Sequence, residues 1–171
     1  MQLTNILYAI ATLALPSTSI AVTSPAAYTN TALKSHNTHR ACHGAPALVW
    51  DAKLTANAAA LAATCVYGHN TLIGGGGYGQ NIGYFSSTKA TAADNPASWL
   101  TQQVESWYGE VSGFSVYGQA SPPTAVVTKA GHFSQVVWVG STGVGCASQF
   151  CGENALVKYP WWYTVCNYSL P

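Results

Sequence analysis

The sequence predicts an α+β domain in which helices pack on a mainly antiparallel sheet. Helical segments come first and β-rich segments follow, without the strand–helix alternation of a parallel fold. The chain of 171 residues is long enough for one domain with a substantial core. Only 6% of its residues are charged and 49% are hydrophobic, which argues against a disordered chain.

The N-terminal segment has the pattern of a secretory signal peptide. The first 22 residues carry no Asp, Glu, Lys or Arg, and Ile6–Leu15 is an apolar run. Small residues lead up to a cleavage point after Ala21, so residues 1–21 are predicted to direct secretion to the extracellular space. A buried N-terminal helix is the alternative. No stretch is long enough to predict a transmembrane segment. Residues 22–30 are expected to form a short tail, and residues 31–171 a single domain.

Three helices are expected in this domain. The first runs from Thr31 to His43, where Gly44 ends it. Asp51 is a favourable N-cap for a second helix, which Gly68 closes, and Asn95-Pro96 begins a third with its cap and proline in the expected order. The apolar faces of the second and third helices are formed by Leu54, Ala58, Leu61, Ala62 and Cys65, and by Leu100, Val104, Trp107 and Val111.

Loops and strands are expected elsewhere. The glycines from Gly74 to Gly77 predict a flexible or tightly turned loop that lacks a phosphate-binding motif, and residues 112–131 predict an irregular loop. The β-rich runs are Val136–Val139, Val144–Phe150 and Leu156–Tyr168. Alternation along a strand would place one of Trp161 and Trp162 in the core and the other at the surface or an interface.

Cysteine usage suits a secreted protein. The five cysteines are Cys42, Cys65, Cys146, Cys151 and Cys166. An odd number in an oxidising compartment is most simply two disulfides and one free thiol, and the spacing is poor for a structural zinc site. Asn167 begins an Asn-Tyr-Ser sequon and is a candidate glycosylation site. The net charge is +1 with no basic stripe, so nucleic acid is not an expected partner.

Several motifs together resemble one known family. Gly131–Trp138, followed by Gly145–Ala147, resembles one signature of the CAP superfamily, which comprises cysteine-rich secretory, antigen 5 and pathogenesis-related class 1 proteins. Tyr163–Tyr168 resembles its second signature. His36-Asn37, Arg40-Ala41 and Leu48–Trp50 match its opening segment. The resemblance covers about residues 36–168 and is greatest to short, single-domain fungal or plant members. It implies an α-β-α sandwich, in agreement with the α+β prediction.

The resemblance also implies a cleft lined by two histidines and two acidic residues. His69 and His132 match the histidines, Glu110 matches one acidic residue, and Gln80 stands where the family has Glu. His69, His132 and Glu110 are therefore candidate ligands for a divalent cation, Zn²⁺ or Mg²⁺, and could support metal-assisted hydrolysis. Gln80 removes a negative charge and a basic acceptor, which weakens both expectations. The alternative for all four residues is a structural hydrogen-bond network that requires no cofactor.

Two further expectations follow from the resemblance. The family pattern pairs Cys65 with Cys151 and Cys146 with Cys166, which leaves Cys42 as a free thiol in a monomer or as the link of a dimer. Some relatives bind sterols through an aromatic loop or hold fatty acids between helices. The candidate lipid loop here runs from Phe114 to Thr128, and core packing is the alternative for its aromatic residues. Its candidate contact residues are Phe114, Val116, Tyr117, Pro122 and Pro123.

The leading hypothesis is a secreted, non-enzymatic CAP protein that binds a sterol or a fatty acid and acts in host–microbe interaction. A metal-dependent hydrolase that uses the His/Glu cleft is the second hypothesis. An effector or signalling module recognised by a protein receptor is the third, and it would depend on exposed loops.

Overall fold

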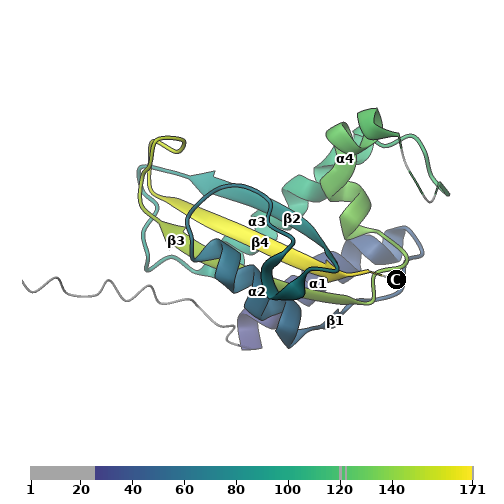
Figure 1. Cartoon of the computed structure of the whole chain (residues 1–171), viewed down its shortest axis with the longest axis horizontal. Helices are drawn as coiled ribbons and strands as arrows, with labels where there is room; N and C mark the ends of the chain where they lie inside the picture. The colour runs from purple at the N-terminus through teal and green to yellow at the C-terminus, as the bar shows by residue number, and fades with distance from the viewer. Residues whose placement is uncertain (1–25, 120, 122, 171) are drawn as a thin grey trace, which may run out of the picture.

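The computed structural model describes residues 26–119, 121 and 123–170, so the predicted signal peptide and Pro122 lie outside it. Within these residues, four strands form one sheet in the order β1-β3-β4-β2 (Figure 1). The strands are β1 (Val49–Trp50), β2 (Tyr78–Ser86), β3 (Gly143–Cys151) and β4 (Trp161–Ser169). The central strand β4 is antiparallel to β2 and β3, and the short β1 is parallel to β3. The predicted mainly antiparallel α+β fold is confirmed.

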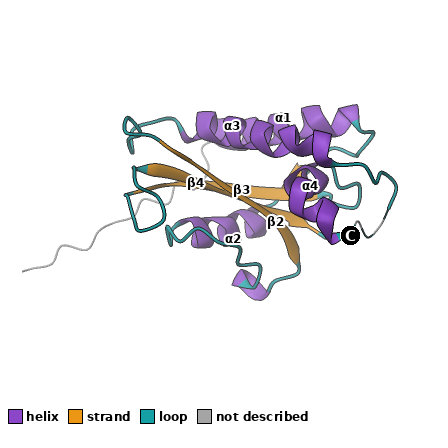
Figure 2. Ribbon diagram, turned by 90° about the horizontal axis from the view of Figure 1, so that it is seen from above, coloured by secondary structure: helices purple, strands orange, loops and turns teal. Residues whose placement is uncertain are grey.

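Helices cover both faces of the sheet. Figure 2 shows α1 (Ala26–Cys42) and α3 (Pro96–Gly109) side by side on one face and α2 (Ala52–Ala62) on the other. The fourth helix, α4 (Thr124–Val136), lies at the end of the sheet where the described chain ends. This is the α-β-α sandwich that the resemblance implies.

The helix starts follow local capping chemistry. The Asp51 carboxylate accepts the backbone N–H of Leu54 at 2.9 Å, and the Asn95 side chain accepts that of Ala97 at 3.0 Å. Both caps were predicted from sequence. The first helix begins at Ala26 rather than Thr31, so residues 26–30 of the expected tail are helical. A tertiary contact explains the extension, because the buried Tyr28 hydroxyl lies 2.7 Å from Ser148 Oγ on β3.

Helix α4 contradicts two predictions. Residues 124–131 were expected in an irregular loop and Val136–Val139 in a strand, but Thr124–Val136 is helical. The β-branched valines suggested a strand. The segment forms a helix instead, because Ala130, Phe133 and Val136 recur every three residues and are all fully buried on one helix face. The second half of the expected lipid loop therefore belongs to a helix.

Strand β2 was not predicted, because its glycines and amides weaken any strand pattern. It forms because it pairs with β4 along its whole length. Two of its glycines also allow helices to pack closely against the strand. A Cβ at Gly79 would collide with Gln135 of α4, and one at Gly83 with Gln103 of α3.

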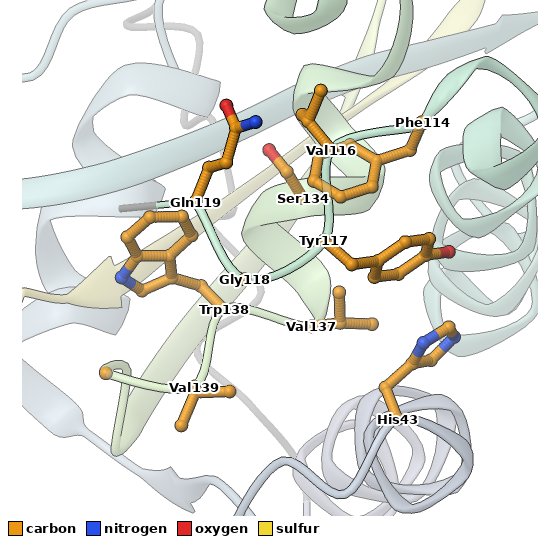
Figure 3. Close-up of a pocket in the computed structure, with 11 residues that line it drawn as sticks. His43, Phe114, Val116, Tyr117, Gly118, Gln119, Ser134, Val137, Trp138 and Val139 are labelled. Carbon is orange, nitrogen blue, oxygen red and sulfur yellow. The ribbon is translucent and has the colours of Figure 1, made fainter. Parts of the chain in front are cut away.

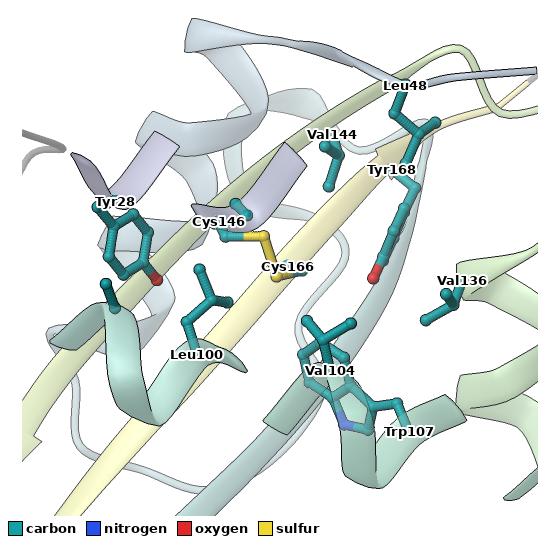
Figure 4. Packing of buried hydrophobic residues seen from close by; sticks show 12 residues of the cluster. Tyr28, Leu48, Leu100, Val104, Trp107, Val136, Val144, Cys146, Cys166 and Tyr168 are labelled. Carbon is teal, nitrogen blue, oxygen red and sulfur yellow. A yellow bond between two sulfur atoms is a disulfide. The ribbon is translucent and has the colours of Figure 1, made fainter. Parts of the chain in front are cut away.

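Each face of the sheet has its own buried cluster and disulfide. Cys146–Cys166 lies in the cluster under α1 and α3 (Figure 4), and Cys65–Cys151 joins the end of α2 to β3. These are the pairs that the resemblance implies. Trp161 and Trp162 are both buried, so the expectation that one would be exposed is wrong. Both side chains are buried because helices cover both faces of the sheet.

Candidate functional site

Two hollows flank the second half of α4 within the described residues. One, called here the histidine cleft, has a volume of about 570 Å³ and contains His69, Gln80, Glu110 and His132. The other, called here the apolar cavity, has a volume of about 490 Å³ and lies under the segment from Phe114 to Gln119. Ser134 and Trp138 line both hollows, so the last turn of α4 and the residues just after it form a wall shared between them.

Glu110 holds this wall in place. Helix α4 is kinked at Ala130, where φ is −146° and ψ is 32°. The kink exposes backbone donors at the start of the helix segment that follows. Glu110 Oε2 accepts the N–H groups of His132 and Phe133 at 3.0 and 3.2 Å. The carboxylate therefore acts as an N-terminal cap supplied from the end of α3, and its charge suits the positive end of that segment.

The same carboxylate orients the His132 ring. Glu110 Oε1 lies 2.7 Å from His132 Nδ1. An ionised carboxylate can only accept, so Nδ1 carries the proton and Nε2 of the neutral ring keeps its lone pair. The Trp107 indole lies nearly parallel to the imidazole, with 6.0 Å between ring centroids. His132 is thus held in one tautomer and one orientation.

A chain of amides fixes the tautomer of His69. The Asn167 side-chain NH₂ donates to the Leu54 carbonyl at 3.2 Å, which turns its Oδ1 toward Gln80. Gln80 Nε2 donates to that Oδ1 at 2.9 Å, so Gln80 Oε1 faces the other way. There it accepts the backbone N–H of Asn70 at 3.1 Å and lies 3.1 Å from His69 Nδ1. Because Oε1 only accepts, His69 also carries its proton on Nδ1 and keeps Nε2 unprotonated when neutral.

This chain of amides gives a physical reason for Gln80. A carboxylate at position 80 could not donate to Asn167 Oδ1, so Asn167 would have to turn its NH₂ toward the cleft and its oxygen toward the Leu54 carbonyl. Gln80 and Asn167 are therefore matched in donor and acceptor. The residue that departs from the family pattern completes a satisfied network.

The donor set is a poor fit to a catalytic metal. His69 and His132 each offer Nε2, while three hydrogen bonds already occupy the Glu110 carboxylate. Catalytic zinc sites use three protein ligands, and Mg²⁺ prefers oxygen. In the part of the chain that the structure describes, three ligand atoms within 4.8 Å of one another come from His36, Cys146 and Cys166. Both sulfurs are in a disulfide, so that group is not a metal site either.

Asn167, the candidate glycosylation site, lies in β4 of the folded chain. Its side chain is fully buried, its NH₂ is bonded to Leu54 and its oxygen to Gln80. A glycan on this nitrogen would require β4 to leave the sheet. The sequon lies in a strand inside the sheet, and glycosylation of Asn167 stays a prediction.

The apolar cavity gathers part of the predicted lipid loop. Phe114, Val116 and Tyr117 line it, and Pro123 does not, because Pro123 precedes the first turn of α4. Figure 3 shows the segment 114–119 crossing the cavity opposite Val139, with His43 projecting from the end of α1 toward Tyr117. The rings of Phe114 and Tyr117 meet edge to face at 5.0 Å.

Sequence reasoning did not place Val137, Trp138, Val139 or His43 in this wall. The first three were expected in a strand but follow the end of α4, and His43 was expected only at the end of a helix. No local signal could have placed His43 in the cavity, since α1 and the 114–119 segment meet only in the tertiary structure.

The sandwich fold and the two disulfides define a class of disulfide-linked α+β domain. Residues 33–168 match the family model CAP, described as the cysteine-rich secretory protein family, and the chain belongs to this family. Among residues 26–119, 121 and 123–170, no helix combines the length and the apolar character needed to cross a bilayer.

Curated relatives include fungal and plant pathogenesis-related proteins. A "Probable pathogenesis-related protein" of Arthroderma benhamiae is 43% identical over 80% of this chain and 42% of its own length. The "Fruiting body protein SC7" of Schizophyllum commune is 37% identical over 81% of this chain and 62% of its own. The chain thus spans less than two thirds of these relatives. "Pathogenesis-related protein 1C" of Nicotiana tabacum is 31% identical over 81% of this chain and 73% of its own.

Solved structures share the fold. "Crystal Structure of Na-ASP-1" superposes with a TM-score of 0.71 at 22% identity, covering 88% of this chain and 40% of that chain. "Crystal structure of NaASP2 with Zn2+" superposes with a TM-score of 0.69 at 19% identity, covering 91% and 83%. At these identities the likeness concerns the fold alone.

Proposed function

We propose that this protein is a secreted, non-enzymatic CAP protein that binds a small hydrophobic ligand, a sterol or a fatty acid, in the apolar cavity. One observation carries the proposal: large apolar side chains stand exposed at a concave surface. Tyr117 is 59% exposed and Val139 62% exposed, and both line the cavity. A concave surface lined by apolar side chains is the usual form of a small-molecule binding site.

The cavity is supported from below by a ring cluster. Phe133 is fully buried and contacts Phe114 and Tyr117, with ring centroids 5.3 and 6.5 Å away. These contacts hold the 114–117 segment against α4. A preformed apolar wall of this kind binds without a large ordering cost.

The test is lipid binding by the full chain produced through an oxidising secretory route. Saturable binding of a sterol or a fatty acid is expected. The double variant Phe114→Ala/Tyr117→Ala should weaken it by about tenfold or more, because two aromatic contact surfaces are lost. Tyr159→Ala is the matched control, since Tyr159 is 50% exposed and does not line the cavity. Absence of saturable binding by the wild-type chain would overturn the proposal.

A metal-dependent hydrolase at the histidine cleft is the second candidate. Its support is the pair of Nε2 atoms that His69 and His132 keep unprotonated, and the related fold whose title includes Zn²⁺. Gln80 and the occupied Glu110 carboxylate count against it. Stoichiometric zinc uptake and turnover, both lost in His132→Ala that still folds, would move the function to this cleft.

Secretion and partners belong to the same proposal. N-terminal sequencing of the secreted protein tests cleavage after Ala21. Cys42 is exposed and has no disulfide partner among the described residues, so a non-reducing gel of wild type against Cys42→Ser separates a monomer from a dimer. Biological activity that survives loss of lipid binding and metal binding would favour recognition by a protein receptor in host–microbe interaction.

A further inference from the structure

Among the described residues that line the apolar cavity, His43 is the one whose side chain can carry a positive charge. We propose that His43 is the head-group anchor of this cavity and makes it select a hydrophobic ligand that ends in a carboxylate over the same chain with a neutral end. This inference rests on the proposed function, since it concerns the ligand class of the same cavity.

The His43 ring is held firmly at the edge of the cavity. Its backbone N–H donates to the Arg40 carbonyl at 3.0 Å, and Gly44 at φ +65° turns the chain away just after it. The ring meets Phe133 edge-on at 5.3 Å and Tyr108 edge-on at 5.7 Å. It lies nearly parallel to Tyr117, the exposed ring at the mouth (Figure 3). An anchor that is already oriented costs little entropy when a ligand binds.

A hydrogen bond occupies one ring nitrogen of His43 and leaves the other for a ligand. His43 Nε2 lies 3.1 Å from the Tyr108 hydroxyl, which can donate to this nitrogen or accept from it. When the imidazole is protonated, Nε2 donates to the hydroxyl oxygen and Nδ1–H is a second donor.

Nδ1–H of the protonated ring therefore offers a donor, and Nδ1 has no hydrogen-bond partner in the described part of the chain. A donor needs an acceptor on the ligand. A carboxylate is the strongest acceptor that a hydrophobic ligand can bring, and its hydrogen bond with a histidine strengthens when the ring is charged. A hydroxyl or an ester accepts more weakly.

The groups around His43 leave this donor to a ligand. On α1, His39 pairs with Glu105 of α3 at 2.9 Å, and the Cys42 thiol is exposed and donates to its own helix. Tyr108 and Tyr117 present phenol rings to His43 and bring no carboxylate to it. Toward α4 the ring meets Phe133, which is apolar. No carboxylate among these neighbours competes for His43, because Glu105 is already engaged by His39.

The experiment compares three ligands of one chain length: a saturated fatty acid, the matching alcohol and the methyl ester. Dissociation constants are measured with the full, disulfide-bonded chain. His43→Leu should weaken the acid by about tenfold or more, as loss of a charge-assisted hydrogen bond does, and change the alcohol and ester by less than about twofold. His43→Gln keeps an N–H donor without a charge and should fall between wild type and His43→Leu.

Lys34→Gln is the control, because it removes an exposed positive charge of α1 that does not line the cavity. It should leave all three constants unchanged. Equal weakening of all three ligands by His43→Leu would assign His43 to cavity shape and overturn the inference, and so would no weakening of the acid. Failure of the wild-type chain to bind any of the three, or a sterol, would instead overturn the proposed function.

Discussion

The histidine cleft and the apolar cavity share a wall, but the side chains of the cleft are hydrogen-bonded within the fold and those of the cavity are exposed. In the cleft, Glu110 is hydrogen-bonded to the backbone of α4, and Gln80 is hydrogen-bonded to Asn70 and Asn167. In the cavity, Tyr117 and Val139 keep more than half of their surface exposed. The residues of the family motif, in the histidine cleft, are therefore engaged in holding the fold. The segment 114–119, which carries no motif, presents the exposed apolar surface.

Loss of the shared wall should have the largest effect on the molecule, and Arg40 holds this wall together with Glu110. Its guanidinium is fully buried and donates to the carbonyls of Pro46, Val136, Trp138 and Ser141 at 2.8–3.0 Å. We predict that Arg40→Met lowers the free energy of unfolding by about 4 kcal/mol, because buried carbonyls lose their donor. Denaturant unfolding measures this, and Lys34→Met on the exposed side of α1 should change it little. A small loss in Arg40→Met would show that solvent replaces the guanidinium.

The next effect concerns the core beneath the cleft. The Asn81 amide donates to the His132 carbonyl and to the Tyr168 hydroxyl, and that hydroxyl donates to Nε2 of the buried His36. His36 Nδ1 is bonded to the Ala32 carbonyl. Burial lowers the pKa of His36 to about 4 in the folded state, against about 6.5 when it is exposed.

The sign of the pH dependence follows from this lowered pKa. Between about pH 6.5 and pH 4, His36 is protonated in the unfolded chain and neutral in the folded chain. The contribution of His36 to the free energy of unfolding is therefore complete above about pH 6.5 and is lost as the pH falls toward 4. The loss amounts to about 3 kcal/mol. Unfolding at a series of pH values should show this slope in wild type and its absence in His36→Gln. Equal slopes in both proteins would contradict the assignment.

Glu110 tests whether the cleft is mainly a structural element. We predict that Glu110→Ala costs about 2 kcal/mol of unfolding free energy, because the segment after the α4 kink loses its cap. Hydrogen exchange at the amides of His132 and Phe133 should accelerate. Tyr117→Ala in the cavity should cost less than about 0.5 kcal/mol, as expected for an exposed side chain. The exposed carboxylate of Glu105 is the matched control, and Glu105→Ala should cost less than about 1 kcal/mol.

Among the substitutions in the cleft and in the core beneath it, Gln80→Glu should have the smallest effect on stability, and it sharpens the comparison most. The variant loses the donor to Asn167 Oδ1, so a cost of about 1 kcal/mol is expected. It also adds a negative charge beside His69, so zinc should bind more tightly than to wild type in a calorimetric titration. Unchanged zinc affinity would show that the histidines, and not the residue at position 80, limit the donor set.

Local chemistry carried a large part of the prediction. Asp51 and Asn95 cap helices through their own side chains, so their positions could be read from the chain. The order of helices and strands predicted the fold class, and the family motifs brought His69, Gln80, Glu110 and His132 to one cleft, where the structure has them. The sequence spacing left the disulfide pairs open, and the resemblance supplied them.

Only the tertiary structure decided the rest, because those features depend on partners distant in sequence. Strand β2 exists through pairing with β4, and the α1 extension through Tyr28 and Ser148. Asn167, the first residue of the sequon, is buried in the sheet. His43 became part of a cavity because the 114–119 segment folds over the end of α1. The sequence by itself determined which local structures could form and which residues could do chemistry. Packing decided which of those residues were used by the fold and which were left at the surface of a cavity.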